Sequence, residues 1–281
     1  MKFGRIFVWI QCLLPQHAIS RLILRATRVR TPWFKNALLR GFLKLYSVDM
    51  SDAEQSDPYA FASFNEFFTR ALKADARSID MGAHTIACPV DGMISEAGSI
   101  DGDTLLQAKN RRYSLAELLA GEKWASLFEG GRFATIYLAP FNYHRVHMPF
   151  RGDLKETVYV PGRLFSVNAV SAAYVPKLFA RNERILTLFD TAHGQIALIM
   201  VGALNVGSMA TVWAGDITPA PKRAVTTLPP RRVTLDKGAE LGRFNMGSTV
   251  ILLFQKNRAD LHAGVRSGAA VRLGEPLGSL R

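Results

Sequence analysis

The chain has only two cysteines, Cys12 and Cys88, and it contains no run of about eighteen apolar residues. Two cysteines are too few for a disulfide framework, and no Cys-x-x-Cys spacing is present for zinc binding or thiol exchange. The missing apolar run excludes an uninterrupted membrane-spanning helix. We therefore expect a protein of a reducing, cytoplasmic setting that lies on a membrane and does not cross it.

Acidic residues are absent from the first 48 positions, although the chain as a whole carries a formal net charge of +12. Apolar residues in this segment recur at helical spacing before Pro15, after Pro15, and again from Thr31. Pro32 occupies the first-turn position of the third pattern, where a missing N–H is tolerated. We expect three amphipathic helices, with basic side chains supplied by Lys2, Arg5, Arg21, Arg25, Arg28, Arg30, Lys35, Arg40 and Lys44.

A basic amphipathic segment can meet nucleic acid or an anionic lipid surface. Binding to nucleic acid favours basic and aromatic residues spread over the β surface, whereas here the basic cluster is confined to the apolar-faced helices. Gln11, Pro15 and the arginines that follow favour a surface anchor over a secretory signal. We expect an anionic membrane surface as partner and no nucleic acid, the alternative being that these helices pack on the rest of the protein.

Short β-rich runs separated by Gly and Pro begin at Thr85. They lie too close together for crossover helices, which predicts an α+β fold with a mainly antiparallel, sandwich or barrel-like β core. We expect strands at 85–88, 92–96, 133–139, 185–189, 195–201, 209–213 and 249–254, and a helix at 113–119. Residues 1–48 would form the membrane-association module and residues 49–281 the catalytic domain.

A polar stretch, Ser51 to Pro58, is typical of a linker, and a helix is expected over Ser63 to Lys73. Its basic residues, Arg70 and Lys73, are predicted to be solvated.

A Gly247-Ser248-Thr249 triplet stands directly before a hydrophobic strand. In a strained turn, Ser248 Oγ can attack the Gly247 carbonyl and convert the amide into an ester. Removal of the serine α-proton would then eliminate the Gly247 carboxylate and leave dehydroalanine, which hydrolyses to a pyruvoyl group. Alone, the triplet is a common turn sequence.

The base and its orienting carboxylate can come from His147 and Asp91. If Asp91 accepts a hydrogen bond from one nitrogen of His147, the other nitrogen can take the Ser248 proton. This assumes that the three residues meet in space. Taken singly, His147 could be a structural histidine and Asp91 a turn residue before Gly92.

Several separated motifs together resemble the bacterial-type phosphatidylserine decarboxylase family over nearly the whole length. They are Phe64-Asn-Glu-Phe-Phe68 with Arg70, Pro89-Val-Asp-Gly92, Leu106-Gln-Ala-Lys109 with Tyr113-Ser-Leu115, Tyr143-His-Arg-Val-His-Met-Pro149, Gly162-Arg-Leu-Phe-Ser-Val-Asn168, Asn182-Glu-Arg184 and Gly247-Ser-Thr249. The resemblance implies that Asp91, His147 and Ser248 form a self-cleavage triad and that His144 assists decarboxylation as proton donor. Met246 replaces the usual Leu, a volume-conserving change.

The resemblance also implies a function. Cleavage at Gly247-Ser248 would give chains 1–247 and 248–281, which stay together as a heterodimer or a dimer of these. The covalent pyruvoyl cofactor derived from Ser248 would form a Schiff base with phosphatidylserine and release CO2 to give phosphatidylethanolamine. No metal is implied. The expected location is peripheral, at the cytoplasmic face of the bacterial inner membrane.

Two other functions fit parts of the sequence. A zinc hydrolase could use His144, His147 and Asp91 as ligands, but it leaves Gly247-Ser248 without a role. A non-enzymatic, basic lipid-binding module explains only the first 48 residues. Lys109, Arg145 and Arg184 could contact an anion, although ordinary structural pairing is the commoner role of such residues.

Overall fold

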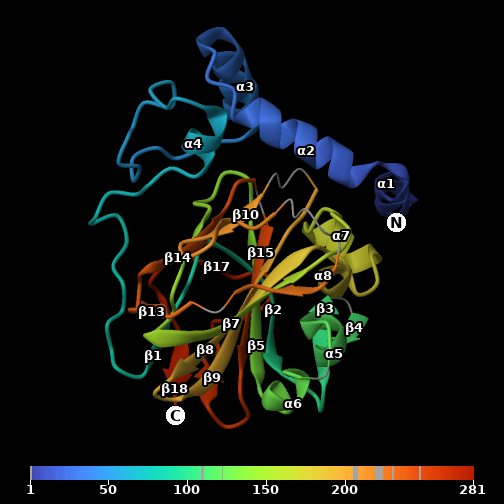
Figure 1. Ribbon diagram of the computed structural model, residues 1–281, viewed down its shortest axis with the longest axis vertical. Helices are drawn as coiled ribbons and strands as arrows, with labels where there is room; N and C mark the ends of the chain where they lie inside the picture. Colours follow the sequence, from blue (N-terminus) through green and yellow to red (C-terminus); the bar gives the residue numbers. More distant parts are fainter. Residues whose placement is uncertain are drawn as a thin grey trace.

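The computed structural model describes residues 2–108, 111–121, 123–204, 208–218, 224–229, 231–246 and 248–281, except for the side chains at positions 2, 3, 5 and 248. Three N-terminal helices lie across one end of a β-rich body, and the C-terminus lies at the opposite end (Figure 1). The predicted fold class, α+β with an antiparallel core and a helical N-terminal module, is confirmed.

The three expected N-terminal helices are α1 (Lys2–Leu13), α2 (Gln16–Thr27) and α3 (Pro32–Leu45). Thr31 directly precedes α3 without a side-chain capping hydrogen bond, and Pro32 occupies the first turn, as the sequence predicts. In the described part of the chain, no single helix is long and apolar enough to span a membrane. The pair Ile6–Leu13 and Gln16–Thr27 meets the criteria of length and composition together, but it is bent by 82°.

The module is fastened to the body by side-chain hydrogen bonds. Gln11 Oε1 accepts from the backbone N–H of Ser166 at 2.7 Å, and Gln16 Oε1 accepts from that of Leu164 at 2.9 Å. At the other end of α2, Arg28 forms an ion pair with Asp216 at 2.6 Å. A boundary at residue 48 remains a prediction.

The helix expected over Ser63 to Lys73 is shorter, α4 (Phe64–Phe68). Ser63 begins it by accepting a hydrogen bond from the Glu66 N–H, and the Thr69 hydroxyl donates to the Asn65 carbonyl at its end. The prediction that Arg70 is solvated is wrong. Arg70 is 5% exposed and its Nη2 donates to the Phe141 carbonyl at 3.2 Å.

Arg70 is buried because it follows α4, whose aromatic side chains are packed into the protein. Phe64, Phe67 and Phe68 are buried with Leu39 of α3, and Phe42 of α3 packs edge-on against all three rings. The Arg70 guanidinium lies 5.7 Å from the centre of the Phe67 ring. Lys73 is exposed, as predicted.

The main sheet has nine strands in the described residues and stays open, without closing into a barrel. Its order is β12-β7-β8-β9-β15-β5-β2-β17, with β13 also paired to β7, and its named pairs are antiparallel. The strands are β2 (Gly92–Ser99), β5 (Arg132–Leu138), β7 (Gly152–Val160), β8 (Arg184–Thr191), β9 (Gly194–Val201), β12 (Thr226–Thr227), β13 (Thr234–Leu235), β15 (Ser248–Phe254) and β17 (Ala270–Val271).

Smaller sheets and short helices surround this sheet. One has the order β11-β10-β14-β6, one β1-β18-β16, and β3 pairs with β4. Their bounds are β1 (Thr85–Ala87), β3 (Thr104–Ala108), β4 (Arg111–Ser114), β6 (Arg145–His147), β10 (Met209–Thr211), β11 (Gly215–Asp216), β14 (Glu240–Phe244), β16 (Ala259–Leu261) and β18 (Pro276–Leu280). The helices are α5 (Leu115–Leu119), α6 (Ala125–Phe128), α7 (Ala169–Tyr174) and α8 (Leu178–Arg181).

All seven expected strands exist, but the helix expected from Tyr113 begins only at Leu115. Ser114 and Glu117 form a capping box there, so Tyr113 belongs to β4. The core centres on β15, where every residue from Val250 to Phe254 is fully buried.

Several residues of the sequence motifs have structural roles. A Cβ on Gly92 would lie 2.5 Å from the Tyr137 carbonyl oxygen, so only glycine lets β2 approach β5 this closely. Gln107 is fully buried and bonds the backbone of Ala172, Val175 and Leu178 around α7 and α8. The motifs therefore report packing as well as chemistry.

Candidate active site

Ser248 is the first residue of β15, and its backbone pairs with Leu138 of β5. The next residue, Thr249, also pairs with Val201 of β9. Gly247 and the Ser248 side chain lie outside the described residues. The turn before them is fixed at Asn245, whose N–H donates to the Ser208 carbonyl at 2.9 Å.

The Asn245 side chain is held as well. Its Oδ1 accepts from Asn65 of α4 at 3.1 Å, and its Nδ2 donates to Asp216 at 3.2 Å. Asp216 in turn pairs with Arg28 at the end of α2. The segment that leads to the predicted scissile bond is thus tied to α2 and α4.

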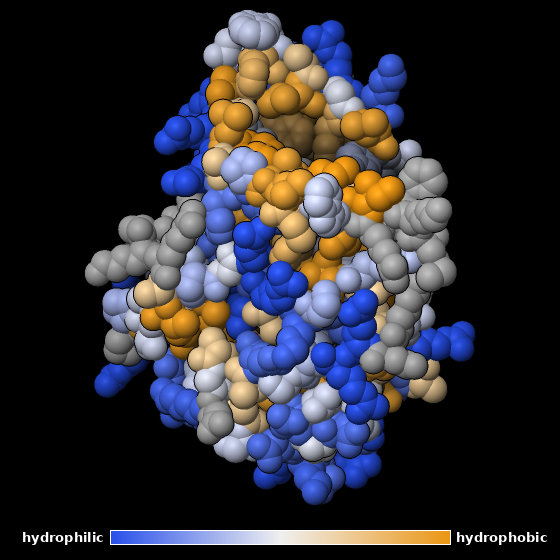
Figure 2. All heavy atoms as spheres, turned by 90° about the vertical axis from the view of Figure 1, so that its right-hand side faces the viewer, coloured by the Kyte–Doolittle hydropathy of each residue, from blue (hydrophilic) through white to orange (hydrophobic). Residues whose placement is uncertain are grey.

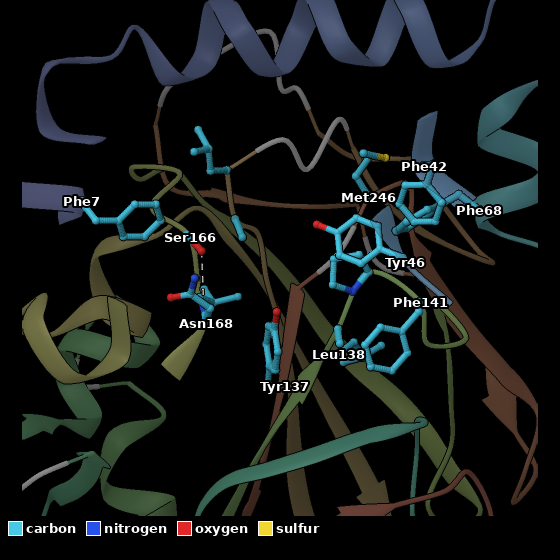
Figure 3. A pocket seen from close by; sticks show the side chains of 15 residues that line it. Phe7, Phe42, Tyr46, Phe68, Tyr137, Leu138, Phe141, Ser166, Asn168 and Met246 are labelled. Carbon is cyan, nitrogen blue, oxygen red and sulfur yellow. Dashed lines mark hydrogen bonds between the residues drawn. The ribbon is translucent and has the colours of Figure 1, made fainter. Parts of the chain in front are cut away.

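A cavity of about 670 Å³ lies beside this turn, between the N-terminal helices and the β body (Figure 3). Met246 and Leu138 form part of its wall, which places it next to the start of β15. The lining is mostly apolar and comprises Phe7, Phe42, Tyr46, Phe68, Tyr137, Leu138, Ala139, Pro140, Phe141, Ser166, Val167, Asn168, Ala203, Leu204 and Met246.

His147 ends β6 and lies near Asp91 through the backbone, because its N–H donates to the Pro89 carbonyl at 2.9 Å. Its Nδ1 lies 2.7 Å from the Gly238 carbonyl oxygen, and its Nε2 lies 2.9 Å from the Tyr143 hydroxyl. Burial lowers the pKa of His147, although the Gly238 hydrogen bond opposes this shift. His147 is therefore a neutral imidazole near pH 7.

Asp91 is 7% exposed and is held by three donors. Arg77 Nε and Nη2 donate to its two oxygens at 3.0 and 2.5 Å, and the Leu273 N–H donates at 2.8 Å. The hydrogen bond expected between Asp91 and His147 is not formed, since both ring nitrogens have other partners. The Asp91 charge nevertheless acts on His147 and is among the causes that raise its pKa.

His144 is fully buried, and its ring packs against Phe68 with centroids 4.1 Å apart. Its Nδ1 donates to the Asn142 carbonyl at 2.7 Å, while its Nε2 is buried without a hydrogen-bond partner among the described residues. Burial lowers the pKa of His144 to about 3. In this structure His144 is therefore neutral, and Nε2 must first accept a proton before it can donate one.

The geometry does not favour a zinc site. Among the described residues, no group of three or more His, Cys, Asp or Glu side chains is arranged to hold a metal ion. Asp91 is bonded to Arg77, and the Nδ1 atoms of His144 and His147 bond backbone carbonyls.

The basic residues considered as anion contacts are paired internally. Arg145 bonds Glu240 at 3.0 Å and the Thr69 carbonyl at 2.9 Å. Arg184 is 2% exposed and donates to the carbonyls of Glu117, Leu118, Ala180 and Asn182, at the ends of α5 and α8. Lys109 lies outside the described residues.

Three contributors to the site were missed by sequence reasoning. Tyr143 stands in the histidine motif but was given no role, although its position four residues before His147 is a usable signal. Arg77 comes from a loop without a recognisable pattern. The Gly238 carbonyl is a backbone group, which residue identity does not reveal.

Comparisons with known proteins cover nearly the whole chain. The family model described as phosphatidylserine decarboxylase matches residues 64–279, and a second model, PSD, matches residues 6–47. A phosphatidylserine decarboxylase proenzyme from Methylococcus capsulatus is 50% identical over 99% of this chain and 97% of that protein. Proteins of the same name from Pseudomonas aeruginosa and Bordetella bronchiseptica are 50% and 51% identical, over 97% of this chain and 96% and 94% of their own lengths. The chain belongs to the phosphatidylserine decarboxylase family.

Proposed function

We propose that this protein cuts itself between Gly247 and Ser248 and then decarboxylates phosphatidylserine to phosphatidylethanolamine. The observation that carries the proposal is the position of Ser248. It starts a central strand opposite Leu138, beside an apolar cavity that reaches the N-terminal helices. Family membership supplies the reaction, and the cavity suits the apolar part of a phospholipid.

In self-cleavage, Ser248 Oγ attacks the Gly247 carbonyl carbon and His147 Nε2 takes the hydroxyl proton, after the Tyr143 hydroxyl has released the single lone pair of that nitrogen. When the C–N bond breaks, that proton passes to the Ser248 nitrogen, which leaves an ester between the two residues. Gly238 holds the opposite ring nitrogen, and Arg77 and Leu273 fix Asp91 nearby as a negative charge. The charge stabilises the imidazolium that forms.

The pyruvoyl group derived from Ser248 supplies an electron sink for the departing carboxylate. The site fits such a group, because Leu138 lies opposite residue 248 and the apolar wall continues from it. His144 Nε2 can accept a proton from the substrate ammonium and return it to carbon after CO2 has left. The mostly apolar wall of the cavity solvates a carboxylate poorly, which favours loss of the carboxylate charge.

The N-terminal helices provide a membrane-facing surface. Figure 2 shows hydrophobic residues gathered around a hollow at the end of the molecule where these helices lie. The exposed side chains include Ile6, Phe7, Trp9, Ile10, Leu13, Leu22, Trp33, Leu45 and Phe141, and both Phe7 and Phe141 also line the cavity. A lipid can therefore enter the cavity from this surface.

Basic side chains on the same helices suit an anionic membrane, and they support a peripheral location at the cytoplasmic face of the bacterial inner membrane. The mature protein would be a heterodimer of residues 1–247 and 248–281. Strand β15 sits between β5 and β9, so the two chains share one sheet.

Intact-mass analysis under denaturing conditions tests the proposal. The wild-type protein should give a fragment that begins at residue 248 with the mass of an N-terminal pyruvoyl group in place of serine, and Ser248→Ala should stay as one chain. The processed protein should convert phosphatidylserine in vesicles with unchanged rate in the presence of chelator. A single uncut chain from folded wild-type protein would contradict self-cleavage.

His144 has a separate readout. His144→Gln should be cut normally but should lose most of its turnover, since proton transfer by one side chain contributes roughly 10²- to 10⁴-fold. Full turnover in the cut variant would remove His144 from the decarboxylation step.

A further inference from the structure

The predicted base, His147, is held by two hydrogen bonds, and neither comes from a carboxylate. Nδ1 faces the Gly238 carbonyl oxygen and Nε2 faces the Tyr143 hydroxyl, at 2.7 and 2.9 Å. A carbonyl oxygen can only accept, so Nδ1 carries the hydrogen of the neutral ring. The Tyr143 hydroxyl therefore donates to Nε2, the nitrogen that must accept the serine proton.

We propose that Tyr143 is a positioning residue for His147: with the Gly238 carbonyl it selects the Nδ1–H tautomer, and its hydroxyl keeps the imidazole neutral. The role rests on the proposed self-cleavage, in which His147 acts as base. It replaces the orienting hydrogen bond that the sequence assigns to Asp91.

The surroundings of Tyr143 suit a permanent donor. Tyr143 is 5% exposed, and burial raises the pKa of its hydroxyl, so the group stays protonated throughout the neutral range. Its ring lies beside the imidazole, with centroids 5.6 Å apart and planes inclined by 31°. A donor to the neutral imidazole stabilises that form and lowers the pKa of His147, in the same direction as burial.

Other charges around His147 are fixed in ion pairs. Glu240 of β14 pairs with Arg145 of β6 at 3.0 Å and with Arg243 at 2.7 Å. Asp91 pairs with Arg77 at 2.5 Å. Glu240 and Asp91 raise the pKa of His147 and Arg145 lowers it. Tyr143 is the neutral group that contacts the base nitrogen directly, which makes its contribution separable from these charges.

Nuclear magnetic resonance of ¹⁵N-histidine-labelled Ser248→Ala protein tests the role without self-cleavage. The His147 signals, assigned by their loss in His147→Gln, should show the Nδ1–H tautomer. Adding Tyr143→Phe should raise the His147 pKa by roughly 0.5 to 1 unit, the equivalent of one neutral hydrogen bond. Tyr159→Phe is the matched control, because it removes a buried hydroxyl that donates to Glu183 at 2.7 Å.

An Nε2–H tautomer, or a His147 pKa that Tyr143→Phe leaves unchanged, would overturn the proposal. The tautomer is read without any change at Tyr143, so the test survives if Tyr143→Phe does not fold. In the cleavable chain, Tyr143→Phe should move the acid limb of the self-cleavage rate to higher pH by the same amount. If the titration behaves as expected but the wild-type chain is never cut, self-cleavage and the positioning role both fail, while the hydrogen bond from Tyr143 to His147 stands.

Discussion

Burial of ionisable side chains distinguishes the surroundings of the predicted site. Arg70, Asp91 and His144 are each at most 7% exposed, and only Asp91 has its charge matched by a bidentate partner. Desolvation lowers the pKa of both Arg70 and His144, but only His144, whose ordinary pKa is 6.5, becomes neutral by this shift. His144 is therefore a neutral imidazole whose buried Nε2 is unprotonated.

This burial links His144 to the acid stability of the protein. The pKa of His144 is about 3 in the folded chain, below the ordinary value of 6.5. Between these two pH values the unfolded chain therefore binds a proton at His144 and the folded chain does not. Stability from this group is complete above pH 6.5 and falls by roughly 1.4 kcal/mol per unit as the pH drops toward 3. In the uncut Ser248→Ala protein, urea unfolding at pH 7.5 and 5 should show a loss of about 2 kcal/mol that His144→Gln lacks.

His147 contributes to the pH dependence of the unfolding free energy in Ser248→Ala and in Ser248→Ala with His144→Gln alike. Its contribution therefore cancels when the two proteins are compared. Parallel pH profiles of the two variants would show that His144 takes up a proton in the folded state, contrary to this account.

The Arg77–Asp91 pair should behave as a coupled unit. The side chains of Arg77 and Asp91 are 11% and 10% exposed, so removing one partner leaves a buried charge. Arg77→Met should cost about 3 kcal/mol of unfolding free energy in the Ser248→Ala protein, and its effect should be markedly smaller when Asp91→Asn is already present.

The matched control is the surface pair Arg112–Asp101, whose side chains are 58% and 79% exposed. Its removal should change the unfolding free energy by less than about 1 kcal/mol. Purely additive effects of the Arg77 and Asp91 changes would mean that the observed contact contributes nothing to stability.

At the scale of elements, helices α1 to α3 have a buried face and an exposed face. One side anchors them to the body through residues such as Gln11, Gln16 and Leu39, all at most 3% exposed. The other side leaves Trp9 and Leu13 each 67% exposed. Large exposed apolar side chains on a basic helix are typical of a membrane-contacting face, which supports the proposed lipid partner.

Substitution on that face should separate lipid binding from folding. Trp9→Glu with Leu13→Glu should weaken sedimentation with phosphatidylglycerol-containing vesicles by more than about tenfold, because each buried apolar side chain contributes roughly 1.5–3 kcal/mol. Met81→Glu, at a 69% exposed position outside the helices, should bind like the wild type. Unchanged vesicle binding by the double variant would rule out this face as the membrane contact.

Elements differ in how far their sequence predicts them. Strands β9 and β15 are apolar runs buried on both faces, so they are recognised from residue type alone. The first half of strand β7 carries Asp153, Lys155 and Glu156, which are exposed or half-buried, and the three-residue strand β6 contains Arg145 and His147. Because these segments are polar, neither β6 nor β7 is recognised as a strand from sequence, although β6 carries the predicted base.

The residues of the site likewise differ in how far the sequence predicts them. Motifs identify Asp91, His144, His147 and Ser248 as the candidate residues, because their side-chain chemistry is specific. Their partners could not be predicted in the same way, since Arg77 arrives on an irregular segment and Gly238 contributes only a carbonyl. Side-chain identity is encoded locally, whereas hydrogen-bond partnership depends on tertiary packing.

At the scale of the whole molecule, the proposed small chain, residues 248–281, supplies strands to sheets that the rest of the protein builds. Residues 248–281 supply β15 between β5 and β9, β17 beside β2, and β18 between β1 and β16. The Leu273 N–H also donates to Asp91. The two products of cleavage should therefore elute together in gel filtration under native conditions and separate only in denaturant. Release of residues 248–281 without unfolding would contradict this arrangement.

The central position of β15 also sets the order of events during biosynthesis. Ser248 reaches its register opposite Leu138 only when the following strand has been inserted between β5 and β9, which are made earlier. If the chain cuts itself as proposed, a ribosome must therefore release nearly the entire polypeptide before maturation can begin. By the same proposal, an interrupted or misfolded chain would keep an unmodified serine at position 248.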